Sequence, residues 1–142
     1  MNIGRFMVVC FSLLGACQVN AFDVDAVLGK WTISDVYCGS CKSTDRTDIG
    51  TNITLLRDRV DNPLAGGGCP GITGYRVLPD GSTSRVAALR KLNSRWLARG
   101  KEAKAVSATC DNMDFMLFVV LADGSLVYVP EGEIVFRLGK AP

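Results

Sequence analysis

The sequence contains no histidine, has a net charge of only +2 and has no apolar run as long as a membrane span. Without histidine the chain has no Ser-His-Asp or Cys-His catalytic group and no HExxH zinc site. The small net charge argues against nucleic-acid binding. No arrangement of carboxylates, thiols or glycines is typical of a particular reaction. We therefore expect a protein without catalytic residues, cofactor or metal.

What the sequence does contain suffices for one folded domain. Its 142 residues are 48% hydrophobic and 21% charged, which is typical of a globular chain with a single core. The start has the layout of an export signal, with Arg5, the apolar run Phe6 to Leu14 and a small-residue site at Val19-Asn20-Ala21. We therefore predict a signal peptide over 1–21 and one β-rich domain over 22–142, periplasmic or secreted.

The same leader supports a second interpretation. Leu14-Gly15-Ala16-Cys17 resembles the bacterial lipobox, in which the cysteine is lipidated and becomes the first residue. Under this alternative, 1–16 is a lipoprotein signal and Cys17 tethers the protein to a membrane, as in an outer-membrane lipoprotein. We favour simple cleavage, and a lipid-modified Cys17 detected by mass spectrometry decides for the alternative.

Four cysteines remain in the predicted domain: Cys38, Cys41, Cys69 and Cys110. An exported protein meets an oxidising environment, so two disulfides are expected. Three connectivities are allowed, and the sequence does not select one of them. Only one close cysteine pair exists, which argues against a four-thiolate zinc site.

The close pair lies in Cys38-Gly39-Ser40-Cys41, which has the spacing of a thioredoxin-type redox site. Such a site normally opens a helix, whose N-terminus lowers the thiol pKa. Here the polar run 42–48 follows, and this run is typical of a loop. We interpret the pair as a structural disulfide and keep thiol–disulfide exchange as an alternative function.

Turn signals predict a mainly antiparallel β fold. Asp80-Gly81 and Asp123-Gly124 each lie between apolar runs, a pattern typical of tight hairpins. Glu131-Gly132 predicts a further turn, so that 113–138 forms a three-stranded meander. Its first strand, 115–121, is apolar on both faces, as expected for a strand between a core and another element. The predicted fold is a small meander or barrel stapled by disulfides.

The segment 84–99 is compatible with two structures. Its apolar residues recur at helical spacing, Ser82 can cap the start and Gly100 suits a C-terminal stop, which predicts one helix over about 84–99. Two strands broken near Asn93-Ser94 are the alternative. In either structure, residues four apart share one face.

Three basic residues, Lys91, Arg95 and Arg99, are spaced in this way. They belong to the one charge asymmetry of the chain, seven basic residues against Glu102 alone between 85 and 104. The simplest interpretation is a solvated face that keeps the domain soluble. The functional interpretation is a docking surface for an acidic protein, a phospholipid headgroup or an anionic polysaccharide, and of these an acidic protein surface is the partner that we predict.

The run 22–31 ends in Gly29-Lys30-Trp31 and resembles the opening of the calycin, or lipocalin-like, barrels. The resemblance implies that Gly29 and Trp31 begin the first strand and that Trp31 closes the barrel bottom against Arg137. Bacterial inhibitors of secreted metalloproteases share this barrel and are exported. The resemblance to them implies that an N-terminal segment, here Phe22 to Asp25, reaches into a protease cleft. The alternative role of Trp31 is an ordinary core anchor.

Together these features predict an exported, non-catalytic binding protein, either an inhibitor or an immunity protein that neutralises a toxin or hydrolase. One alternative is a small-ligand carrier of the lipocalin type, which needs a hollow barrel interior. Another is a periplasmic thiol–disulfide protein that uses Cys38 and Cys41. A membrane is an expected partner only if Cys17 is lipidated.

Overall fold

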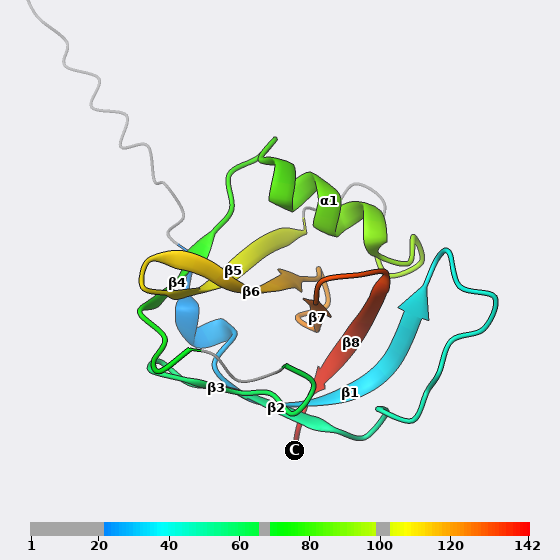
Figure 1. The fold of residues 1–142 in the computed structure, drawn as a ribbon, viewed down its shortest axis with the longest axis horizontal. Coiled ribbons are helices and arrows are strands. Elements are labelled where there is room, and N and C mark those ends of the chain that lie inside the picture. Colours follow the sequence, from blue (N-terminus) through cyan, green and yellow to red (C-terminus); the bar gives the residue numbers. More distant parts are fainter. Residues whose placement is uncertain (1–21, 66–68, 99–102) are drawn as a thin grey trace, which may run out of the picture.

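The computed structural model describes residues 22–65, 69–98 and 103–142, and Figure 1 shows their fold. The predicted signal segment, with Cys17, lies outside the described residues. The described elements are η1 (Val24–Ala26), β1 (Gly29–Cys38), β2 (Asn52–Leu55), β3 (Val60–Asp61), β4 (Gly74–Val77), α1 (Thr83–Lys91), β5 (Lys104–Cys110), β6 (Met113–Val120), β7 (Leu126–Val129) and β8 (Ile134–Lys140).

All eight strands belong to one antiparallel sheet in the order β3-β2-β1-β8-β7-β6-β5-β4, which curls into a half-barrel (Figure 1). The edge strand β4 and the β2–β3 hairpin are tied together at one end. There the Ile72 amide donates to the Asp58 carbonyl at 2.8 Å, and the Tyr75 hydroxyl donates to the Leu56 carbonyl at 2.6 Å. The prediction of a mainly β fold with one helix and two disulfides is confirmed, and the half-barrel is compatible with a calycin-like barrel.

The inner face of the curl holds the larger core. Phe118, Tyr128 and Phe136 come from neighbouring strands on this face. The ring centroids of Phe118 and Tyr128 lie 5.5 Å apart, and those of Tyr128 and Phe136 lie 6.1 Å apart. Trp31 and Phe118 are each only 1% exposed. Burial of one such side chain stabilises a fold by about 1.5–3 kcal/mol, so this face carries much of the stability.

The outer face of the same strands has a second, smaller core. Alternation along β6, β7 and β8 points Val119, Val127 and Val135 away from the aromatic layer and into a cluster with Ala88 and Leu92 of the helical segment. In Figure 1, α1 lies outside the curl, over β5 and β6. The meander strands are therefore apolar on both sides because each side meets a separate layer.

Two of the predicted turns connect the meander as expected. Asp123-Gly124 joins β6 to β7 and Glu131-Gly132 joins β7 to β8, with Gly124 and Gly132 at φ of +82° and +94°. The hairpin predicted at Asp80-Gly81 is wrong, because that turn leads from β4 into α1. The Ser82 hydroxyl accepts a hydrogen bond from the Arg85 amide and caps the helix, so the chain becomes helical after the turn.

The helix predicted over 84–99 exists but ends eight residues earlier, at Lys91. Leu92 is already extended, and the Asn93 side chain accepts a hydrogen bond from the Arg95 amide in a local turn. This turn folds Leu92 and Trp96 back into the outer core, where they are 6% and 8% exposed. Gly100, the predicted stop, lies outside the described residues.

Candidate binding groove

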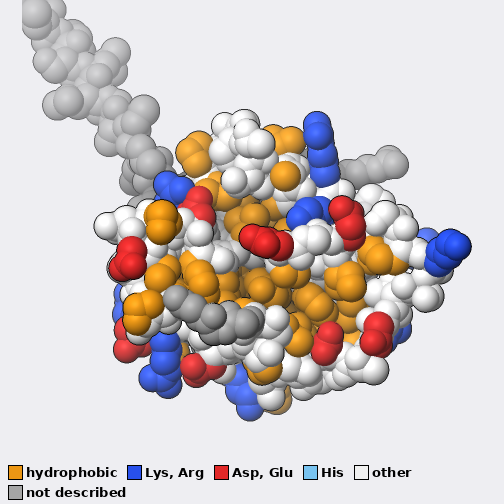
Figure 2. Space-filling model, viewed as in Figure 1, with side chains coloured by type: hydrophobic (Ala, Val, Ile, Leu, Met, Phe, Trp, Pro, Cys, Tyr) orange, Lys and Arg blue, Asp and Glu red, His pale blue; other side chains and the backbone are white. Residues whose placement is uncertain are grey.

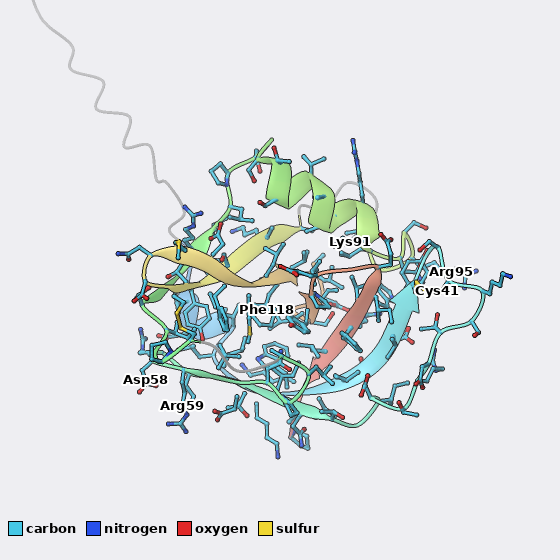
Figure 3. All side chains as sticks on the ribbon, viewed as in Figure 1. Cys41, Asp58, Arg59, Lys91, Arg95 and Phe118 are labelled. Carbon is cyan, nitrogen blue, oxygen red and sulfur yellow. A yellow bond between two sulfur atoms is a disulfide. The ribbon has the colours of Figure 1, made fainter. Side chains whose placement is uncertain are left out.

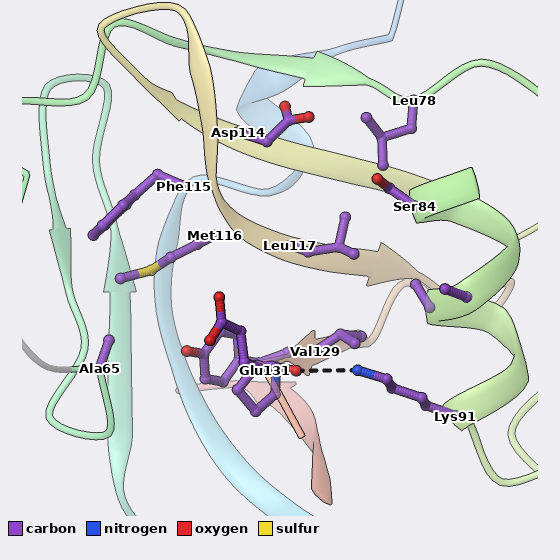
Figure 4. Close-up of a pocket in the computed structure, with 14 residues that line it drawn as sticks. Ala65, Leu78, Ser84, Lys91, Asp114, Phe115, Met116, Leu117, Val129 and Glu131 are labelled. Carbon is purple, nitrogen blue, oxygen red and sulfur yellow. Dashed lines mark hydrogen bonds between the residues drawn. The ribbon is translucent and has the colours of Figure 1, made fainter. Parts of the chain in front are cut away.

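A groove of about 540 Å³ opens between α1, the first half of β6 and the end of β7, and Figure 4 shows it in close-up. We call it the α1–β6 groove. Its lining residues are Ala65, Leu78, Ser84, Ala87, Ala88, Lys91, Asp114 to Leu117 and Tyr128 to Glu131.

The groove is open because short side chains face a short strand. The wall from α1 consists of Ser84, Ala87 and Ala88 with Lys91, and three of these four side chains have no more than two heavy atoms. On the sheet side, β7 pairs with β6 only from Leu117 to Val120, while β6 itself begins at Met113. The first half of β6 therefore extends beyond the end of β7.

A β-bulge shapes this part of β6. In the pairing with β5, Asp114 lies opposite Thr109 and Met116 lies opposite Ala108, so that Phe115 has no residue opposite it. A bulge bends a strand and changes the direction of its side chains, and such bulges are frequent beside functional sites. Phe115 is 36% exposed at the groove, and Figure 4 shows its ring directed away from α1.

Exposed apolar side chains gather in this region of the surface. Figure 2 shows hydrophobic side chains across the middle of one face of the molecule, below α1 and above the β2–β3 hairpin. Five large apolar side chains are exposed among the residues that the structure describes, and one of them, Phe115, lines the groove. Contiguous exposed apolar surface on a small protein is typical of an interaction site.

Charged groups stand at the rim of the groove. Asp114 accepts two hydrogen bonds from the Arg76 guanidinium, at 2.9 and 2.7 Å, and this pairing holds the pKa of the Asp114 carboxyl below its ordinary value. The Lys91 ammonium reaches the Pro130 carbonyl at 3.5 Å (Figure 4). Within the described ranges neither Lys91 nor Glu131 has an ion-pair partner.

The predicted basic face is only partly present. Lys91 is the last residue of α1 and lines the groove, whereas Arg95 lies beyond the helix in the Asn93 turn. The two residues therefore do not share a helical face, because the helix ends between them; Figure 3 labels both. Arg99 lies outside the described residues.

The four cysteines form Cys38–Cys41 and Cys69–Cys110. Cys38 ends β1 and is 6% exposed, while Cys41 is exposed in the following loop. No described helix starts at this pair, so the helix N-terminus that lowers a thiol pKa in thioredoxin-type sites is missing. The longer bridge connects the segment before β4 to the end of β5 and reinforces the closed end of the half-barrel.

The contact between Trp31 and Arg137 that the calycin resemblance implies is wrong. Arg137 lies on the outer face, where its guanidinium is 5.9 Å from the Trp96 ring and pairs with Asp123. Trp31 lies on the inner face and is covered by Lys140, whose ammonium is 5.3 Å from the ring centroid. Side chains an odd number of positions apart on a strand point to opposite faces, so Lys140 and Arg137 cannot both face Trp31.

The opening of β1 otherwise has the expected arrangement. Trp31 is buried, and its indole N–H donates to the Val27 carbonyl at 2.9 Å. Gly29 adopts φ of +125°, a conformation that favours glycine, and a Cβ there would lie 3.6 Å from the Lys140 Cε. The Gly-x-Trp pair therefore fixes the start of the sheet, which fits both of the roles considered for Trp31.

The N-terminal segment, by contrast, is held against the domain. Phe22 packs against the inner core, Val24–Ala26 forms a 3-10 helix, and Asp25 pairs with Arg57. In this structure the segment Phe22 to Asp25 is not an extended arm.

The described residues contain no group of three or more His, Cys, Asp or Glu side chains that could hold a metal ion. None of the helices in the described ranges is long and apolar enough to cross a membrane. No protein family, curated protein or solved structure matches the chain.

The sequence does not predict the groove, because the groove depends on the position at which β7 ends. The apolar run 115–121 was expected to be buried on both faces, and only its second half is fully covered by β7 and the two cores. Pro130 directly after β7 is the one local signal, since proline cannot continue a ladder of hydrogen bonds.

Proposed function

We propose that the mature chain is an exported, non-catalytic binding protein that neutralises another protein, as an inhibitor or an immunity protein, by holding a segment of it in the α1–β6 groove. The observation that carries the proposal is the groove itself, an open apolar site with Phe115 at its edge on an otherwise well-packed domain. Two disulfides fit an oxidising compartment. We place the protein in the periplasm or outside the cell, with lipidation at Cys17 as the alternative.

A protein segment suits this site better than a small ligand inside the barrel. The inner face is filled by side chains that are almost fully buried, among them Trp31, Ile53, Phe118 and Leu138 at 0–1% exposure. A lipocalin-type carrier needs that volume to be hollow. An apolar groove with a polar rim on the outside, in contrast, is how proteins commonly anchor a partner.

The test is capture of a partner from envelope and culture-medium extracts by residues 22–142 immobilised on resin. Replacement Phe115→Ser should reduce capture at least tenfold. The matched control is Ile134→Ser, because Ile134 is equally exposed, at 36%, but does not line the groove. Equal capture by both variants, or loss of capture by both, contradicts the proposal.

A second candidate function is thiol–disulfide exchange, favoured by the bond between Cys38 and Cys41 within a CxxC spacing. The surroundings support it weakly, since Ser40 lies 3.8 Å from the Cys38 sulfur and donates to Glu133, whose negative charge disfavours a thiolate. Reduction of insulin disulfides with dithiothreitol as electron donor tests it. Catalysis that is lost in Cys41→Ser supports exchange, and a rate equal to dithiothreitol alone refutes it.

A further inference from the structure

We propose that the segment held in the α1–β6 groove is an extended strand that pairs with the open edge of β6 at Met113–Met116 and places a carboxylate beside Lys91. This inference rests on the proposed function and adds the conformation and chemistry of the bound segment.

The first argument is the pairing of β6. On one edge, β5 pairs with β6 from Cys110 opposite Met113 to Lys104 opposite Val120, interrupted only by the bulge at Phe115. On the other edge, β7 pairs only with Leu117 to Val120. Within the described ranges, the stretch Met113–Met116 thus has a strand on one side only. Backbone groups on such an edge are a template for another strand.

The second argument is that β7 cannot cover this edge itself. Pro130 follows the last residue of β7 and has no N–H to donate to a ladder. The Pro130 carbonyl accepts from Lys91 instead, and Gly132, at φ of +94°, turns the chain toward β8. The sequence therefore stops β7 at Val129 and leaves room beside β6.

The third argument is the fit of side chains. A strand rises by about 3.3 Å per residue, so the open stretch of β6 offers about 13 Å of edge. Alternate side chains of a bound strand would point toward Leu117 and Val129 on one side and toward Met116, Tyr128 and Ala65 on the other. The short side chains Ala87 and Ala88 on the α1 wall leave space for apolar groups of the incoming segment.

The fourth argument is charge. The α1 sequence, TSRVAALRK, contains no acidic residue, and among the described residues Lys91 is the only basic one that lines the groove. Asp114 on the opposite rim is already bonded to Arg76. A carboxylate on the bound segment would supply the ion-pair partner that Lys91 lacks among the described residues. Glu131 lies at the same end and opposes such a carboxylate, so Glu131→Gln should strengthen binding.

The probe for the experiment is a displayed library of random decapeptides, selected on residues 22–142 with both disulfides formed. The strongest peptide is then synthesised in its parent form and in two N-methylated forms, which block the odd or the even backbone amides. In a paired strand alternate amides point toward the neighbouring strand. We expect one methylated form to lose at least tenfold in affinity and the other to retain it.

The charge prediction uses the same peptides. Selected sequences should have apolar residues at alternate positions and carry Asp or Glu near one end. Lys91→Glu should weaken binding at least tenfold, Glu131→Gln should strengthen it, and Arg90→Glu is the matched control, because Arg90 is exposed on α1 but does not line the groove. Phe115→Ser should also weaken binding of the peptide.

Other outcomes overturn the inference. Selected peptides that tolerate both methylation patterns, lose affinity with both, or ignore Lys91→Glu and Phe115→Ser do not bind as a strand on β6. If Phe115 controls capture of a protein partner but no peptide is selected, the extended-strand mode fails while the proposed function stands. If Phe115 does not affect capture either, the proposed function fails as well.

Discussion

The inner and outer faces of the half-barrel are built by the same strands and differ in what covers them. The inner face is enclosed by residues from β1, β2 and β5 to β8, with large aromatic side chains at its centre. The outer face is covered by one nine-residue helix and a turn, whose contacts with the sheet are mostly small or aliphatic. The inner face is therefore filled by large side chains, and the groove opens at the border between the two cores, where Met116 and Tyr128 of the inner cluster meet Val129 of the outer cluster.

This difference separates two tasks that a small domain must combine. Apolar side chains that are packed without gaps stabilise the fold. Apolar side chains left at an open site can bind a partner, but they contribute less to the stability of the domain. In this chain Phe118 is buried in the inner core, whereas Phe115, three positions away on β6, is 36% exposed at the groove (Figure 3 labels Phe118; Figure 4 labels Phe115).

Phe118→Ala should lower the free energy of unfolding by about 3–5 kcal/mol, because it leaves a cavity among buried aromatic rings. Phe115→Ala should lower it by less than about 1 kcal/mol, because the ring is already 36% exposed. Urea unfolding followed by tryptophan fluorescence measures both. Equal losses for the two variants would show that the groove is part of the stabilising core.

The two disulfides should contribute unequally in the same way. The Cys69–Cys110 bridge spans 41 positions, for which the loss of loop entropy in the unfolded chain is worth about 4 kcal/mol, while Cys38–Cys41 spans 3 and is worth below about 2 kcal/mol. Paired Cys→Ser variants of each bridge, compared by urea unfolding, check this order. A larger loss of unfolding free energy on removal of Cys38–Cys41 would show that Cys69–Cys110 is not the more stabilising of the two disulfides.

The hydrogen bond from the Tyr75 hydroxyl to the Leu56 carbonyl, which links β4 to the β2–β3 hairpin, should make the stability of the domain sensitive to alkaline pH. Burial, with a smaller contribution from Asp58, raises the pKa of Tyr75 to about 12, and its hydroxyl donates to the Leu56 carbonyl. The protonated form is favoured in the folded state, so this stability is present below pH 10 and is lost as pH rises toward 12. Tyr75→Phe should cost about 1 kcal/mol at pH 8 and flatten the loss between pH 10 and 12. An unchanged alkaline slope would contradict this role.

Charges around the outer face should have the smallest effect. Hydrogen bonds from Arg76 lower the pKa of Asp114, and hydrogen bonds from Ser125 lower that of Asp123. A depressed carboxyl pKa contributes stability above the unfolded value, near 4, which is lost as pH falls through the folded pKa. Both side chains are largely exposed, so Asp114→Asn or Asp123→Asn should each remove less than about 1 kcal/mol at pH 7 and little at pH 3. An equal loss of unfolding free energy at pH 7 and pH 3 would indicate that the aspartate side chain contributes by packing and not by its charge.

The sequence predicted the meander well because its turns and its strands agree. Gly124 and Gly132 supply the positive φ that their turns require, and the apolar runs on either side are long enough to pair. The same Asp-Gly signal failed at Gly81 because a turn residue determines the local backbone and not the element that follows. The turn at Asp111-Asn112, with φ of +51° and +62°, was not recognised, although both residue types tolerate that conformation.

The wrong prediction of a contact between Trp31 and Arg137 and the absence of any prediction of the groove have the same physical cause. Whether Arg137 or Lys140 faces Trp31 depends on strand register, and the β1–β8 pairing contains an irregularity between Ile33 and Asp35. Likewise, the groove depends on the bulge at Phe115 and on the distance between α1 and the end of β7. Register, bulges and gaps between elements are tertiary properties, and local patterns of residues carry little information about them.

We expect the partner to bind at the α1–β6 groove. Hydrogen–deuterium exchange of residues 22–142, alone and with the captured partner, tests it most directly. We expect new protection of backbone amides in Met113–Leu117 and in α1, with little change in the β2–β3 hairpin. Protection confined to β2 and β3, or to the loop around Cys41, would contradict it.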